Sequence, residues 1–121
     1  MTSKIIKEFN EIMEYFLIQV TPIIGNKYHF RFKQIIQTNS VLPLEQFLIH
    51  ILPYRDRVKN KDQTLFTDDN LINKIDEDDI LANVFTLQNE YNNLSEVSKD
   101  NIWDFLQAML ILGEDYIKIK M

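Results

Sequence analysis

The sequence has no cysteine, and only two glycines and three prolines occur among its 121 residues. The absence of cysteine excludes disulfides, thiolate metal sites and a cysteine nucleophile, and it fits a reducing intracellular compartment. The isolated glycines Gly25 and Gly113 cannot form a glycine-rich loop that cradles phosphates. Because no run of about 18 apolar residues occurs, we expect no membrane span and no membrane partner.

Ligands and nucleophiles for chemistry are also scarce. The two histidines, His29 and His50, have no acidic residue three or four positions further on. The acidic tract at 76–79 lacks the alternating ligands and the central glycine of a calcium loop. The few serines stand where turns and helix caps are expected. We therefore expect no metal, no cofactor and no enzymatic activity.

Hydrophobic residues make up 45% of the chain, which is enough for a packed core. The length fits one domain, and we predict a single helical domain over residues 1–121. The net charge of −5 is unevenly distributed. Residues 1–61 carry nine Lys/Arg and five Asp/Glu, whereas residues 62–121 carry four and thirteen. A basic first half and an acidic second half predict a surface with two poles.

A helical period in the apolar residues predicts most of the secondary structure. One apolar stripe over residues 5–20 predicts a first helix, with Ser3 as its N-cap and an end before Pro22. A second stripe over residues 44–52 predicts a helix with Pro43 in its first turn. Each stripe is the face that a helix of a globular protein buries.

The second half of the chain returns to the helical period after a polar interval. Residues 54–61 suggest a short basic helix or an ordered connection, and residues 78–92 resume the helical pattern. Residues 102–117 carry the wide stripe of a last helix, which Ser98 would cap. We therefore predict an all-α fold, a single-domain bundle of about five main helices with a polar, acidic connection around residues 62–79.

The stretch KYHFRFK at residues 27–33 alternates charged and aromatic side chains. As a strand, it would place its cations on one face and its aromatic rings on the other. The alternation stops at Gln34, however, whereas Tyr28, Phe32 and Ile35 have the spacing of a helical stripe. A helix explains more of these residues than a strand, and it needs no partner strand.

Two stretches, LPYRDRVKNKDQTLF at 52–66 and KDNIWDFLQAMLILGEDY at 99–116, are similar to parts of known viral proteins. They resemble a group of small helical proteins encoded by nucleocytoplasmic large DNA viruses (the giant viruses). The matching positions are Leu52, Pro53, Tyr54, Asp62 and Phe66, then Ile102, Trp103, Phe105 and Leu106. These are packing motifs, so the resemblance implies a viral origin and a helical fold but no reaction.

The pattern leaves binding as the expected role. We predict a non-enzymatic protein–protein interaction or structural component that contacts another protein or associates with itself as a homodimer. It would act inside the cell, in the host cytoplasm or the virion if the chain is viral. The alternative is a nucleic-acid-associated factor that uses the basic segments 27–33 and 55–61. A hydrolase with converging carboxylates is a third hypothesis.

The candidate contact residues fall into two groups. The basic group would meet nucleic acid or a partner, and we expect it to be exposed: Lys27, Arg31, Lys33, Arg55, Arg57, Lys59 and Lys61. The apolar group would extend past the core: Tyr116, Ile117 and Ile119. A continuous positive face would favour nucleic acid, whereas an exposed apolar patch would favour a protein partner.

Overall fold

The computed structural model describes residues 2–66 and 91–120, and every regular element within these residues is helical. The fold is therefore all-α, as predicted. The elements are α1 (Thr2–Ile24), α2 (Lys27–Thr38), α3 (Leu42–Ile51), η1 (Leu52–Tyr54), α4 (Arg55–Lys59), η2 (Gln63–Phe66), η3 (Tyr91–Asn93) and α7 (Glu96–Lys120). The η elements are short 3-10 turns, and α4 is a helix of five residues.

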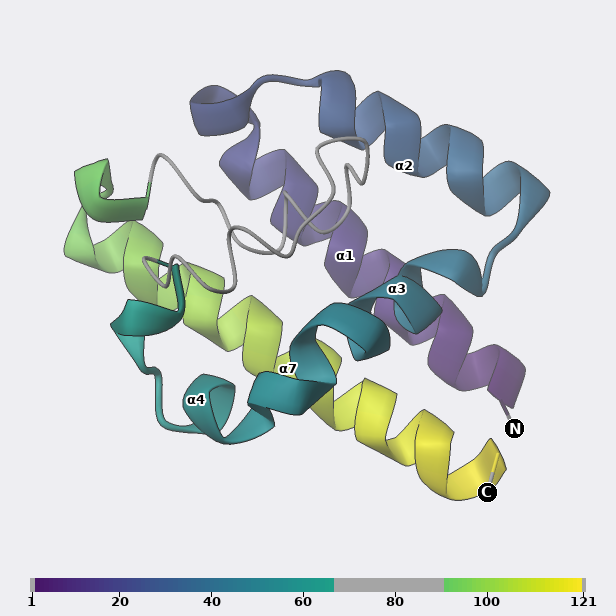
Figure 1. Ribbon diagram of the computed structural model, residues 1–121. Coiled ribbons are helices and arrows are strands. Elements are labelled where there is room, and N and C mark those ends of the chain that lie inside the picture. The colour runs from purple at the N-terminus through teal and green to yellow at the C-terminus, as the bar shows by residue number, and fades with distance from the viewer. Residues whose placement is uncertain (1, 67–90, 121) are drawn as a thin grey trace.

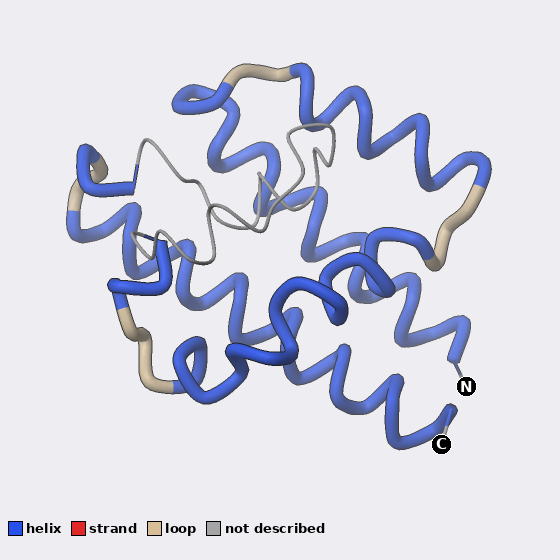
Figure 2. The backbone as a smooth tube through the Cα atoms, viewed as in Figure 1, coloured by secondary structure: helices blue, strands red, loops and turns tan. Residues whose placement is uncertain are grey.

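The two longest helices, α1 and α7, lie side by side and antiparallel (Figure 1). Figure 2 shows that this arrangement brings the N- and C-terminal ends close together. The rings of Phe16 and Phe105 meet edge-on between the two helices, with centroids 5.8 Å apart. The helix α3 packs on both of them, α2 packs on α1 and α3, and α4 packs on α7. The α1–α7 pair is therefore the framework on which the other helices lie.

The core is built from the apolar stripes that the sequence predicts. Most of its side chains come from α1 and α7, and α2, α3, α4, η2 and η3 supply the rest. The buried apolar residues are Phe9, Met13, Phe16, Leu17, Val20, Phe32, Leu44, Phe47, Ile51, Val58, Leu65, Tyr91, Ile102, Trp103, Leu106, Met109, Leu110 and Tyr116. Each long helix therefore buries one face in the core, and its opposite face carries polar side chains together with exposed apolar ones such as Tyr15 and Ile111.

The end of α1 differs from the prediction, because the helix continues through Pro22 to Ile24. Proline removes a single backbone donor, and here the lost bond falls in the last turns of the helix. The backbone N–H of Gly25 still donates to the carbonyl of Thr21, at 2.8 Å. Gly25 has a φ of +85°, a left-handed conformation that glycine adopts at no steric cost. The helix therefore ends at the glycine and not at the proline.

The helix starts also differ from the prediction. The cap of α7 is Ser95 and not Ser98, because the Ser95 Oγ accepts a hydrogen bond from the backbone N–H of Ser98, at 3.1 Å. Ser3 lies inside the first turn of α1, which begins at Thr2. Pro43 lies in the first turn of α3, as predicted. A stripe of apolar residues predicts that a helix exists more reliably than it predicts the first residue of that helix.

The predicted acidic connection and the helix after it fall largely outside the described residues. Residues 62–66 of the connection are described, and there η2 buries Leu65 in the core. Residues 67–79 lie outside, as do residues 78–90 of the helix predicted over 78–92. The remaining Tyr91 belongs to the turn η3.

The buried pair Tyr91 and Trp103 ties η3 to α7. The Trp103 Nε1–H donates a hydrogen bond to the Tyr91 hydroxyl, at 2.8 Å, and the two rings meet edge-on. Burial raises the pKa of Tyr91 above its ordinary value, although the hydrogen bond from Trp103 acts in the opposite direction. The carboxylates of Glu96 and Asp100 add to the increase. The phenol therefore stays neutral at physiological pH and serves the packing.

The contact between α3 and α7 depends on Gly113. A Cβ atom at Gly113 would lie 2.7 Å from Leu48 Cδ2 and 3.5 Å from Leu48 Cγ. A larger residue at this position would require the terminal methyl of Leu48 to move. Glycine is unfavourable inside a helix by about 1 kcal/mol relative to alanine, so its position here reflects packing and not helix propensity.

We predict that Gly113→Leu lowers the free energy of unfolding by about 1–3 kcal/mol, because the new side chain displaces Leu48 and pushes α3 away from α7. The matched control is Ala108→Leu, which adds the same side chain to a half-buried position of α7 and should change stability by less than about 0.5 kcal/mol. Urea unfolding followed by the fluorescence of Trp103 measures both variants. Equal stability of Gly113→Leu and wild type would contradict the close packing.

Candidate functional site

The stretch KYHFRFK forms the first turns of α2, so the prediction of a helix over this stretch is confirmed. Phe32 is fully buried, and Tyr28, Ile35 and Ile36 pack partly against the core. The aromatic residues therefore do not share a single exposed surface, as they would in a base-stacking strand. Only Phe30 is turned to solvent, with 63% of its surface exposed.

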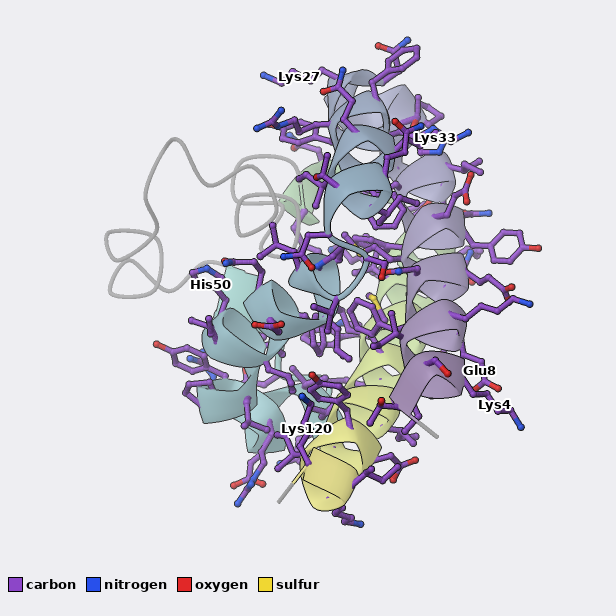
Figure 3. The ribbon with its side chains drawn as sticks, turned by 90° about the vertical axis from the view of Figure 1, so that its right-hand side faces the viewer. Lys4, Glu8, Lys27, Lys33, His50 and Lys120 are labelled. Atoms are coloured by element: carbon purple, nitrogen blue, oxygen red, sulfur yellow. The ribbon has the colours of Figure 1, made fainter. Side chains whose placement is uncertain are left out.

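Glu14 of α1 neutralises the inner flank of α2. Its Oε1 lies 3.3 Å from the Nε2 of His29 and 3.6 Å from the Nζ of Lys33. Lys33 and His29 are one turn apart, so both reach the same carboxylate. Figure 3 shows Lys33 beside α1 in this way. Lys33 therefore contributes less free positive charge than the sequence suggests.

The outer flank of α2 keeps its charge. Lys27 and Arg31 are exposed, and the only ionised side chains in α2 are cationic. The ammonium of Lys27 lies 5.0 Å from the centre of the Tyr28 ring. The Nη1 of Arg31 donates a hydrogen bond to the Oε1 of Gln34, at 3.5 Å. Phe30 lies between Lys27 and Gln34 along one helical row. A cationic patch with one exposed ring is the result, and we name Lys27, Phe30 and Arg31 the α2 patch.

The second basic segment is held by acidic and polar groups of its own surroundings. Arg57 donates to Asp62 Oδ2, at 3.2 Å, and to the Thr64 hydroxyl, at 2.8 Å. The side chain of Arg57 is partly buried, so the prediction that it is exposed needs correction. Hydrogen bonds from the Thr64 hydroxyl and backbone N–H lower the pKa of Asp62, and Arg57 lowers it further. Arg57 therefore has a structural role.

The two lysines of this segment face carboxylates of α7. The Nζ of Lys59 lies 3.3 Å from the Oε1 of Glu114, and the Nζ of Lys61 lies 3.9 Å from the Oδ1 of Asp104. Arg55 is exposed, as expected. Because its neighbours pair with acids, the segment 55–61 does not present a concentrated positive charge.

The two basic segments do not form one face. Figure 1 shows α2 and α4 at opposite ends of the molecule, and in Figure 3 the labelled Lys27 and Lys33 lie far above α4. The cause is the packing, since α2 lies on α1 whereas α4 lies on α7. A nucleic-acid site made from both segments is therefore not assembled, and only the α2 patch keeps that potential.

The predicted apolar contacts near the end of α7 are divided between the core and the surface. Tyr116 is only 8% exposed and belongs to the core, so its candidacy as a partner contact needs correction. The cause is helical geometry, because Tyr116 continues the buried row of Met109 and Gly113. Ile117 is half-buried, and Ile119 is 43% exposed. Of the three residues, Ile119 is the one that the structure leaves most accessible.

A groove with apolar side chains in its lining lies between α1 and α7. It has a volume of about 410 Å³ and is lined by Ile12 and Gln19 of α1 and by Asn101, Asp104, Phe105 and Ala108 of α7. We name it the α1–α7 groove. Sequence reasoning missed it, because its residues stand at the edges of two stripes whose pairing in space the sequence does not state. The feature of the sequence that could have indicated the groove is the unusual width of the apolar stripe in the last helix.

A second groove of about 380 Å³ lies between α1 and α2. Six of its eight lining residues are polar or charged, and the apolar ones are Ile6 and Ile36. The Asn10 side chain lines it and donates from Nδ2 to the Ser40 carbonyl, at 2.9 Å. The Asn10 Oδ1 has no hydrogen-bond partner among residues 2–66 and 91–120, but it is buried and thus out of reach of a ligand in the groove. This groove therefore has a weaker claim as a binding site.

Within residues 2–66 and 91–120, no cluster of three or more His, Asp or Glu side chains could hold a metal ion. In that same part of the chain, no helix has the length and apolar character needed to cross a membrane. Comparison with protein-family models, curated proteins and solved structures gave no match.

We predict that Thr64→Ala raises the pKa of Asp62 toward its ordinary value of 3.8, because the mutation removes the hydroxyl donor that does most to lower it. A lowered pKa in the folded state stabilises the protein above the unfolded-state pKa. That stability is lost as the pH falls through the folded-state pKa. An NMR titration of the Asp62 carboxyl measures the change. Thr38→Ala, which removes an exposed hydroxyl on α2, is the control, and an unchanged Asp62 in Thr64→Ala would contradict the assignment.

Proposed function

We propose that this chain is a non-enzymatic protein-interaction module, an adaptor or structural component that binds a partner along the α1–α7 groove. The observation that carries the proposal is the groove itself, where apolar side chains of two long helices remain accessible on the outside of the fold. Ile12, Phe105 and Ala108 form its apolar floor. Accessible apolar surface with a polar border is typical of sites that bind other proteins.

Neighbouring residues extend this surface along both helices. Tyr15 of α1 and Ile111 and Ile119 of α7 are large apolar side chains with much of their surface exposed. Among the described elements, α3 packs on both helices of the pair, and Figure 3 shows α3 and α4 together on one side of α1. The resemblance to small helical proteins of large DNA viruses suggests where the protein acts. We propose that its partner is a protein of the infected cell or of the virion.

We expect selection from a library of displayed helical peptides to yield binders that require the α1–α7 groove. The variant Ala108→Arg fills the groove with a charged side chain and should lose these binders, because the apolar floor is covered. Ile49→Arg is the matched control, since it places the same charge on an exposed apolar residue of α3. Binding that persists in Ala108→Arg, or that disappears in Ile49→Arg, would contradict a site in the groove.

Nucleic-acid association is the second candidate function, and the α2 patch favours it. Phe30 exposes its ring between two cations on a helix without carboxylates, an arrangement that suits a stacked base between phosphates. The patch is small, however, and the whole chain carries a net charge of −5. We therefore place this function behind protein interaction, and we assign it to α2 alone.

If α2 binds nucleic acid, fluorescence anisotropy should detect single-stranded DNA or RNA binding that weakens steeply between about 50 and about 200 mM salt. The pair Lys27→Gln and Arg31→Gln should then abolish binding, because both phosphate contacts are removed. The matched control pair, Arg55→Gln and Lys59→Gln, removes the same charge from α4 and should bind as wild type does. Absence of binding at the lower salt concentration would rule this function out.

A further inference from the structure

The α1–α7 groove has the residue spacing that accepts another helix. On α7, Phe105, Leu112 and Ile119 follow one another at intervals of seven residues. On α1, Ile5 and Ile12 have the same interval. Side chains seven apart lie on one face of a helix, and two antiparallel helices with such rows leave a seam between them. The spacing thus matches the knobs of a third helix laid along the pair.

Several members of these rows are only partly buried within the fold. Ile5, Ile12, Phe105 and Leu112 all pack against the core from its edge, and each keeps a minor part of its surface accessible. Ile119 is still more exposed. The rows therefore serve the core with one side and present the other side to solvent. A helix that covered them would complete a burial that the chain itself begins.

The α7 bank of the groove is acidic. Between residues 96 and 115 of α7, the exposed charged side chains are all carboxylates: Glu96, Asp100, Asp104 and Asp115. The one lysine in this range, Lys99, has a side chain that is only 13% exposed, and its Nζ lies 3.7 Å from the Oε1 of Glu96 and over the Tyr91 ring, so it offsets the charge of Glu96 alone. Asp104 itself lines the groove. A ligand along this bank therefore meets negative charge over several helical turns.

The cations near the groove do not cancel this charge. On α1, the Nζ of Lys4 lies 4.0 Å from the Oε1 of Glu8, and the Nζ of Lys61 lies 3.9 Å from the Oδ1 of Asp104 on α7. Both distances stand at the outer limit of an ion pair, and the lysine side chains are 82% and 48% exposed. Such exposed pairs contribute little and are easily exchanged for another cation. The bank keeps a net negative charge after both lysines are counted.

We propose that the occupant of the α1–α7 groove is a cationic amphipathic helix of a partner protein. Its apolar stripe would cover the rows of α1 and α7, and its Lys or Arg residues would lie beside Asp104 and Asp115. This inference rests on the proposed function and adds the chemical class of the partner. A second copy of this chain suits the groove poorly, because a two-fold contact there would place one acidic bank near another.

The experiment uses two synthetic helical peptides of about 18 residues, long enough for about five turns. Both carry Leu at heptad positions a and d, and their polar positions are occupied by Lys in one peptide and by Glu in the other. Calorimetric titration gives the affinities, and amide chemical shifts of the labelled protein locate the site. Sedimentation equilibrium of the protein alone gives its oligomeric state.

The expected result is a monomer that binds the Lys peptide at least about tenfold more tightly than the Glu peptide. The largest amide shifts should fall in α1 and α7. Asp104→Asn should weaken the Lys peptide by about 2- to 5-fold, as expected for one exposed charge contact. Its matched control, Asp56→Asn, removes one exposed carboxylate from α4 and should leave the affinity unchanged.

Three results would overturn the inference. Equal or tighter binding of the Glu peptide in the groove would show the wrong partner chemistry, although the groove would remain a docking site. A dimer that Ala108→Arg dissociates and Ile49→Arg does not would identify a second copy as the occupant. If neither peptide binds while displayed peptides do, the occupant is not a cationic helix. Failure of the displayed peptides as well would remove the proposed function itself.

Discussion

The antiparallel packing of α1 against α7 is the constraint on which the rest of this structure depends. Its contacts include the edge-on rings of Phe16 and Phe105. Each of the two helices buries one apolar face in the core. The shorter helices have little surface with which to fold alone, since isolated helices of 10–12 residues are marginal in water. They gain stability by covering this pair, so their positions follow from it.

Glycine at position 113 determines how closely that covering approaches. Because Gly113 has no side chain, Leu48 of α3 packs against the backbone of α7 at that position, and Leu44 lies next to it. The contact holds α3 against the pair, where the Phe47 ring of α3 meets the Phe9 ring of α1 edge-on in the core. The other side of the pair receives no such helix from the described residues. The accessible groove is therefore a consequence of the same packing that completes the core.

Local sequence patterns predicted the helices well, because each stripe is a property of neighbouring residues. The stretch KYHFRFK is an example, since the spacing of Tyr28, Phe32 and Ile35 was enough to favour a helix over a strand. Helix ends were predicted less well, since they depend on single hydrogen bonds such as the one from Ser98 to Ser95. The sequence could not show whether the basic segments 27–33 and 55–61 share one face, because this depends on the different helices on which they pack. The groove was missed for the same reason.

The charge asymmetry of the sequence acquires a physical meaning only in the folded chain. The cations of segment 55–61 are largely used within the fold, where Arg57 holds Asp62 and Lys59 faces Glu114. The cationic patch on α2 and the acidic bank on α7 are what remain, and they lie on different helices. These two surfaces attract opposite kinds of ligand. The proposed partner of the α1–α7 groove would be selected by apolar spacing and by positive charge together, since neither property alone would distinguish it from other helices.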